Sequence, residues 1–105
     1  MDPRRISLDV TVGEYNGVCL PSNEGSTGYH WILPMMPNCI NRTNDEWMPA
    51  FQTSPGYTGT PGVHVFVFQG MTPTQQPAEM EFLLVPPGRD QKPTQRAVCT
   101  VTVRK

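Results

Sequence analysis

The chain carries little charge, few cysteines and no long apolar run. Only 16% of its 105 residues are charged and the formal net charge is −1, so there is no basic footprint for nucleic acid. No stretch approaches the roughly 18 apolar residues that span a bilayer, and no apolar segment follows the charges at the N-terminus as in an export signal. We expect a cytoplasmic protein that binds neither nucleic acid nor membrane, or a lysosomal, vesicular or secreted one if a signal peptide was removed.

The three cysteines, Cys19, Cys39 and Cys99, are odd in number and far apart in the sequence. This spacing suits neither a zinc cluster nor a closed disulfide framework. His30 and His64 are present, but no activating neighbour adjoins a cysteine in its strand-like run. We expect buried free thiols, no metal or other cofactor, no catalytic residue and no enzymatic activity.

Proline and glycine are abundant, with 12 and 9 copies, and they separate short apolar runs. A chain of this length fits one domain, residues 1–105. The runs alternate between apolar and polar residues or are rich in β-branched and aromatic residues, both typical of strands. The predicted strands are 6–12, 15–20, 29–33, 46–51, 63–69, 78–85 and 96–104.

These strands predict an all-β, immunoglobulin-like β-sandwich of about seven to eight strands with Greek-key connections. The segment 78–85 also has the glutamate and methionine content of a short helix, but its length and the prolines on both sides favour a strand. Residues 35–60 are the least regular, and we interpret them as a long connection holding one short strand. We expect Met35, Met36, Met48, Met71 and Met80 to fill gaps in the core.

Loops at the ends of a sandwich carry most binding functions. Three connections have unusual compositions: 21–31, 54–62 and 85–93. Glycine, serine, asparagine and proline are also what any sharp turn requires, so composition alone favours a purely structural role for them.

Particular residues in these connections carry a further signal. Residues 8–14 (LDVTVGE), 20–23 (LPSN) and 26–31 (STGYHW) resemble the opening half of chagasin-family inhibitors, whose signature is Asn-Pro-Thr-Thr-Gly-aromatic-x-Trp. The family's Gly-x-Gly-Gly motif is matched in part by residues 59–62 (GTPG). Its Arg-Pro-Trp motif falls on 86–88 (PPG), where only the central proline agrees. The resemblance covers most of the chain apart from residues 35–58.

The resemblance implies a monomeric, reversible, tight-binding inhibitor of papain-like, cathepsin L-like cysteine proteases. Members of the family insert three loops from one end of the sandwich into the active-site cleft. The implied protease-binding residues are Asn23, Ser26, Thr27, Gly28 and Tyr29 in the first loop, Gly59, Thr60 and Gly62 in the second, and Pro87 and Arg89 in the third. Trp31 is expected to pack into the core at the base of the first loop.

The chain departs from the family pattern at three places. Glu24 and Gly25 stand where the family has a single proline, which leaves the first loop one residue longer. Pro61 replaces a glycine and removes a backbone donor. The third loop lacks the family's arginine and tryptophan, so we expect weaker or more selective inhibition.

Two other functions fit the composition. One is a non-inhibitory adhesion or carbohydrate-binding module that uses Trp47, Tyr57 and Tyr29 as exposed aromatics, with Asp45 and Glu46 beside Trp47. The other is a purely structural domain of a larger assembly.

Overall fold

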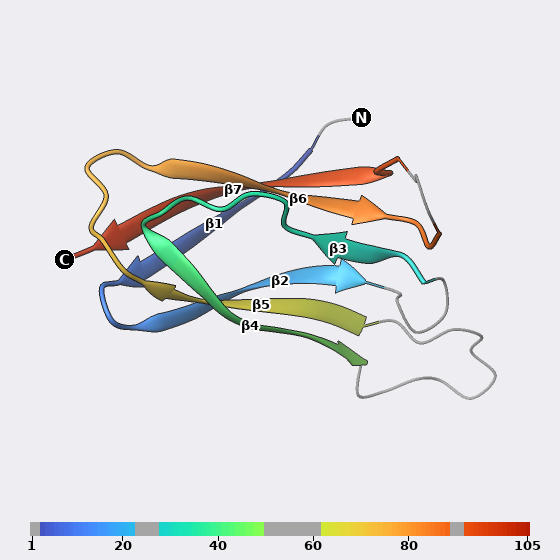
Figure 1. The fold of residues 1–105 in the computed structure, drawn as a ribbon, viewed down its shortest axis with the longest axis horizontal. Coiled ribbons are helices and arrows are strands. Elements are labelled where there is room, and N and C mark those ends of the chain that lie inside the picture. Colours follow the sequence, from blue (N-terminus) through green and yellow to red (C-terminus); the bar gives the residue numbers. More distant parts are fainter. Residues whose placement is uncertain (1–2, 23–27, 50–61, 89–91) are drawn as a thin grey trace.

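A computed structural model of the chain describes residues 3–22, 28–49, 62–88 and 92–105, and these residues form strands and no helix. The order β1-β7-β6-β3 makes one sheet and β2-β5-β4 makes the other. The two sheets lie face to face as layers (Figure 1). The predicted all-β, immunoglobulin-like sandwich is therefore confirmed. The strands are β1 (Arg4–Thr11), β2 (Tyr15–Ser22), β3 (His30–Ile32), β4 (Ile40–Pro49), β5 (Gly62–Gly70), β6 (Ala78–Val85) and β7 (Gln95–Arg104).

The core lies between the sheets and follows from the alternation of the strands. Successive side chains of a strand point to opposite faces, so every second residue of β7 is buried. Phe66 and Phe68 of β5 meet Phe82 of β6 across the gap, with ring centroids 4.8 and 6.5 Å apart. The buried apolar residues are Leu8, Val10, Val18, Leu20, Trp31, Ile40, Phe66, Phe68, Met80, Phe82, Ala97, Cys99, Val101 and Val103.

The two ends of the chain pair with each other. β1 runs parallel to β7, from Arg4 opposite Ala97 to Thr11 opposite Arg104. The chain then turns at Gly13, whose φ of +84° is the left-handed conformation that glycine adopts without steric cost. The amide of Gly13 donates to the carbonyl of Gly70 in β5, which joins the two sheets at this end of the sandwich.

β4 corrects one expectation. Residues 35–60 were interpreted as a long connection with a short strand at 46–51, whereas β4 spans Ile40–Pro49 and pairs with β5 along its length. Its register shifts between Arg42 and Asn44, and the hydroxyl of Thr43 donates to the carbonyl of Val67 at 3.2 Å. This bulge breaks the two-residue period that marks a strand in sequence. The strand prediction for 78–85 is confirmed by β6.

The methionine and cysteine expectations were only partly right. Met80 is buried, but Met35, Met48 and Met71 are 82%, 42% and 50% exposed. Cys99 is a buried free thiol, and Cys39 is half-buried. Cys19 is exposed because Val18 and Leu20, its neighbours in β2, are the residues that face the core.

No helix in the described part of the chain is long and apolar enough to cross a membrane.

Candidate functional site

Three connections leave the sandwich at the same end. β2, β4 and β6 end there, and β3, β5 and β7 begin there (Figure 1). These strand ends flank the connections 23–29, 50–61 and 86–94, which include most of the three loops that the sequence singled out. The fold therefore brings the bases of the three predicted loops to one end of the molecule.

The first and third connections touch at their bases. Gly28 has a φ of +77°, and a Cβ atom built on it would lie 3.2 Å from Cγ and 3.3 Å from Cβ of Pro87. Nδ1 of His30 lies 3.3 Å from the carbonyl oxygen of Gly28, and this bond is donated by the Nδ1-protonated tautomer. A glycine is therefore favoured at position 28 for two reasons: the backbone is left-handed there, and the ring of Pro87 leaves little room for a side chain.

Trp31 anchors β3, the strand that follows the first connection. Its side chain is 3% exposed, which confirms the prediction that it packs into the core. The indole Nε1–H donates to the carbonyl oxygen of Pro21 at 2.8 Å. The indole thereby satisfies its own donor in the core and fixes the end of β2 relative to β3.

A second tryptophan, Trp47 of β4, makes a hydrogen bond to Ser22, the residue that follows Pro21. Its Nε1–H donates to the carbonyl oxygen of Ser22 at 3.2 Å. The indole also covers Gly62, where an added Cβ would lie 2.9 Å from ring atoms of Trp47 and would clash with the carbonyl oxygen of Met48. Gly62 thus leaves room for the indole.

The role of Trp47 was not predicted, because the sequence offered it only as an exposed aromatic for sugar binding. It is half-buried and hydrogen-bonded, which argues against that alternative. No sequence pattern marks this role, because it depends on the β4–β5 register, which places Trp47 opposite the inward-facing His64.

His64 lies in the same corner of the sandwich. It is 8% exposed, and its ring stacks on Phe66 with centroids 4.4 Å apart. Its Nε2 is 3.0 Å from Oδ1 of Asp45 on β4. This contact engages Asp45, one of the two carboxylates that the sequence offered for a sugar site beside Trp47. Within the described residues the hydroxyl of Ser22 is buried with no hydrogen-bond partner.

The structure places four of the predicted protease-binding residues. Gly28 and Pro87 are in contact, Tyr29 beside them is 36% exposed, and Gly62 lies at the start of β5, paired with both Ser22 and Pro49. The other six predicted residues lie outside the described residues. These are Asn23, Ser26, Thr27, Gly59, Thr60 and Arg89.

The acidic, histidine and cysteine side chains of the described residues do not gather around a common point. No group of three or more His, Cys, Asp or Glu side chains is placed to hold a metal ion among them. Burial raises the pKa of the Cys99 thiol from 9.0 to about 11, which keeps it protonated at neutral pH. A thiol with this pKa is a poor nucleophile.

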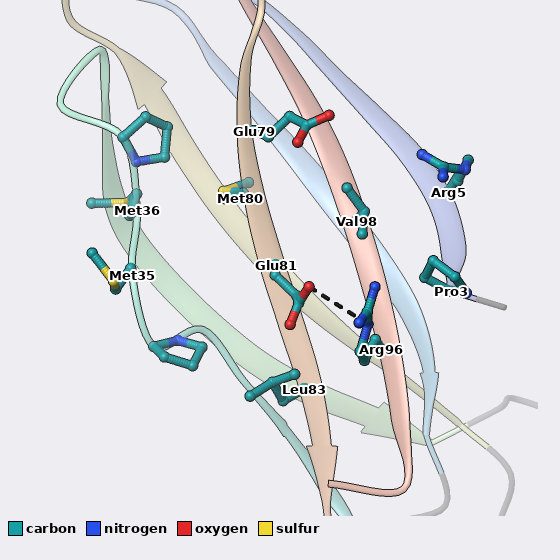
Figure 2. Close-up of a pocket in the computed structure, with 12 residues that line it drawn as sticks. Pro3, Arg5, Met35, Met36, Glu79, Met80, Glu81, Leu83, Arg96 and Val98 are labelled. Atoms are coloured by element: carbon teal, nitrogen blue, oxygen red, sulfur yellow. Dashed lines mark ion pairs between the residues drawn. The ribbon is translucent and has the colours of Figure 1, made fainter. Parts of the chain in front are cut away.

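A separate hollow of about 820 Å³ lies on the outer face of the β1-β7-β6 sheet, beside residues 34–37. Figure 2 shows Glu79, Glu81 and Leu83 of β6 facing it, next to Arg96 and Val98 of β7. Nε of Arg96 is 3.6 Å from Oε2 of Glu81 across this face. None of the four described protease-binding residues lines this hollow.

Comparison with known families identifies the chain. The sequence model described as chagasin family peptidase inhibitor I42 matches residues 9–103, nearly the whole sequence. The chain belongs to the chagasin family of peptidase inhibitors. A search of curated protein sequences finds no significant match.

Solved structures show the same fold for this chagasin-family chain. The cysteine protease inhibitor EhICP2 from Entamoeba histolytica is similar with a TM-score of 0.70 and 14% identity, over 97% of this chain and 88% of that chain. PbICP-C, solved in complex with falcipain-2, gives 0.60 and 19% identity over 98% and 90%. Amebosin gives 0.53 and 21% identity over 98% and 100%. At these identities the structures establish the fold.

Proposed function

We propose that the chain is a reversible, tight-binding inhibitor of papain-like cysteine proteases that blocks the active-site cleft and has no catalytic activity of its own. Membership in a family of peptidase inhibitors supports this proposal. The relative of similar fold that was solved with falcipain-2 supports the kind of partner. We propose that the inhibitor acts as a monomer.

One structural observation carries the proposal: the three predicted loops have their bases at one end of the sandwich. The contact of Gly28 with Pro87 brings the first and third of them to the same place. A cleft-blocking protein requires its contact segments to converge on one rigid scaffold, because a preformed surface loses little conformational entropy on binding. The sandwich provides such a scaffold.

In this proposal Ser26, Thr27 and Gly28 lie across the catalytic cysteine and histidine of the protease. Small side chains allow the inhibitor backbone to approach these groups closely. Blocking a cleft takes an interface of roughly 1,600 Å², and nanomolar affinity corresponds to about −12 kcal/mol. Asn23 and Tyr29 complete the first loop in this assignment.

The second and third loops flank the first. Gly59, Thr60 and Gly62 run beside the unprimed side of the cleft, and Pro87 and Arg89 belong to the primed side. Pro61 lacks a backbone donor, and the third loop has neither the arginine nor the tryptophan of the family motif. We therefore propose weaker or more selective inhibition than in a chain that carries all three motifs.

Titration of papain and of a cathepsin L-like protease with the purified chain tests the proposal. We expect stoichiometric, reversible loss of activity, with an inhibition constant well below micromolar. Full protease activity at micromolar inhibitor would contradict it.

The placement of the first loop needs a separate variant. Thr27→Arg should weaken inhibition at least tenfold while the melting temperature stays within about 2 °C of the parent value, because a bulky side chain prevents close approach. A substitution at Gly28 is less suitable, since its φ of +77° and its contact with Pro87 make it structurally demanding. Tyr15→Phe, on an exposed residue next to the turn between β1 and β2, serves as the control that should inhibit like the parent.

We also propose a cytoplasmic location. The three free cysteines support it, because exposed thiols such as Cys19 persist in a reducing compartment. Fractionation of the source cells with an antibody against the chain tests this proposal, and recovery only from vesicles or medium would contradict it.

A further inference from the structure

Trp47 joins three strand ends at the base of the predicted loops. It lies near the end of β4, its indole donates to the carbonyl oxygen of Ser22 at the end of β2, and its ring covers Gly62 at the start of β5. Ser22 is the last described residue before the first loop. Gly62 is the first described residue after the second loop. Ser22 and Gly62 also pair directly in the β2–β5 register, and the indole adds a side-chain contact from β4 to this junction between the bases of two loops.

The surroundings of the indole leave it little freedom. The carbonyl of Met48 and the ring of Trp47 fill the space that any side chain at position 62 would need. Trp47 is opposite His64 in the β4–β5 register, and His64 is held by Asp45 at 3.0 Å. A half-buried aromatic ring with its single donor satisfied packs in a defined orientation.

We propose that Trp47 is a positioning residue of the inhibitor, which fixes the end of β2 and the β4–β5 hairpin in the mutual arrangement that the protease recognises. This inference rests on the proposed function. Trp47 acts through Ser22 and Gly62, and it makes no contact with the protease.

This role predicts a particular kinetic signature. Loss of a direct interface contact mainly raises the dissociation rate constant. Loss of a positioning contact lowers the fraction of inhibitor molecules in the binding-competent arrangement, and the apparent affinity falls by that fraction. A neutral hydrogen bond is worth a factor of about five in such an equilibrium. The effect should therefore appear in association.

Trp47→Phe removes the Nε1–H donor and keeps an aromatic ring over Gly62. We expect the association rate constant with papain to fall by up to about fivefold, the full factor applying where the binding-competent arrangement is the minor one, while the dissociation rate constant changes less than twofold. Tyr15→Phe is the matched control, a loss of one polar group from an exposed aromatic at the other end of the sandwich, and it should change neither rate. Measurements at 15 °C, far below unfolding, separate this effect from a general loss of stability.

The free protein gives a second readout. Amide hydrogen exchange of Leu20 and Ser22 and of residues 62–64, followed by NMR, should become about fivefold faster in both stretches in Trp47→Phe and stay unchanged in Tyr15→Phe; Pro21 has no amide hydrogen. An unchanged association rate constant, a rise confined to the dissociation rate constant, or exchange that changes in only one stretch would overturn the positioning role. If the parent chain fails to inhibit any papain-like protease, the proposed function is wrong, and the exchange measurement alone decides whether Trp47 couples the two strand ends.

Discussion

Gly13 and Gly28 have nearly the same backbone conformation in different surroundings. Their φ values are +84° and +77°, in the left-handed region that other residues enter at a cost of about 1–2 kcal/mol. A Cβ on Gly13 would meet no atom within 4 Å, whereas one on Gly28 would press against the ring of Pro87. Replacing Gly13 therefore tests the backbone conformation alone, whereas replacing Gly28 tests the backbone conformation and the lack of space together.

Gly13→Ala should lower the free energy of unfolding by about 1 kcal/mol, from the backbone alone. Gly28→Ala should lower it by about 1 kcal/mol more, because the ring of Pro87 must move. Urea denaturation of both variants measures the difference. In a Pro87→Ala background the extra loss at Gly28 should shrink, because Cγ at 3.2 Å is removed while Cβ at 3.3 Å remains. Equal losses at the two glycines in the parent would show that the Gly28–Pro87 contact is loose.

The cysteines differ in reactivity because they differ in burial. At pH 8 iodoacetamide should modify exposed Cys19 first, and should modify Cys99 only when the protein unfolds, since burial raises its pKa to about 11. The folded state holds this proton more tightly than the unfolded state, whose pKa is near 9.0. The associated stability is therefore complete below pH 9 and is lost as the pH rises through about 11.

Peptide mass mapping follows the alkylation, and urea denaturation at pH 8 and 10 follows the stability. Cys99→Ala is the control, because it removes the titrating group. Its loss of stability between the two pH values should be smaller than that of the parent. Rapid modification of Cys99 in the folded protein would contradict the assignment.

For single residues, the sequence predicted that Trp31 packs into the core. The assignment of Gly28 to the protease contact stays a prediction. The sequence did not predict the contact of Gly28 with Pro87 or the role of Trp47. Those contacts join residues far apart in the chain, and they exist only once β4 is paired with β5 and β6 with β3. Neither composition nor a linear motif shows which distant residues will be in contact.

Among the elements, β4 was predicted least well. Its residues Asn41, Arg42, Asn44 and Asp45 are polar and exposed, and asparagine and aspartate have low β-propensity. The segment is an edge strand, where polar side chains discourage pairing with other chains, and its bulge interrupts the alternation. β4 is extended because it pairs with β5, whose residues strongly favour strands. The sequence of β4 itself does not show this pairing.

β7 was predicted well, and its alternation gives a test at the scale of a strand. Val101 is fully buried and Thr100 is exposed, and these two residues differ only by a methyl group in place of a hydroxyl. Val101→Thr should lower the free energy of unfolding by about 1–3 kcal/mol, because a hydroxyl enters the core without a designed partner. Thr100→Val should change it by less than about 0.5 kcal/mol.

Urea denaturation measures both variants under one condition. Because valine and threonine have similar shapes and similar β-propensities, the difference reports on which face of β7 is buried. A larger loss for Thr100→Val than for Val101→Thr would contradict the assignment of the buried face of β7.

For the whole molecule, the sequence predicted a sandwich but not that its first and last strands pair. The parallel pairing of β1 with β7 joins Arg4 to Ala97, across almost the entire chain. The alternation of apolar and polar residues identifies strands, but it does not show which strands are neighbours in a sheet. The β6–β7 pair, in contrast, is joined through the short connection 86–94.

This difference in loop length predicts the order of folding. Closing the long loop between β1 and β7 costs more entropy than closing the β6–β7 hairpin, so the β1 contacts should form after the transition state. Leu8→Ala on β1 should lower the free energy of unfolding by about 2–5 kcal/mol and act mainly on the unfolding rate, with a φ-value of about 0–0.3. Phe82→Leu on β6 should give a φ-value of about 0.5–0.8.

Stopped-flow fluorescence of the two tryptophans, buried Trp31 and half-buried Trp47, measures both arms of the chevron plot for each variant. Refolding of the parent should take milliseconds to seconds, as is usual for β-sandwiches with distant strand pairings. A Leu8→Ala variant that refolds more slowly in proportion to its lost stability would show instead that the two chain ends meet early. The parallel β1–β7 pair would then be part of the folding nucleus, and the β6–β7 hairpin would complete the sheet afterwards.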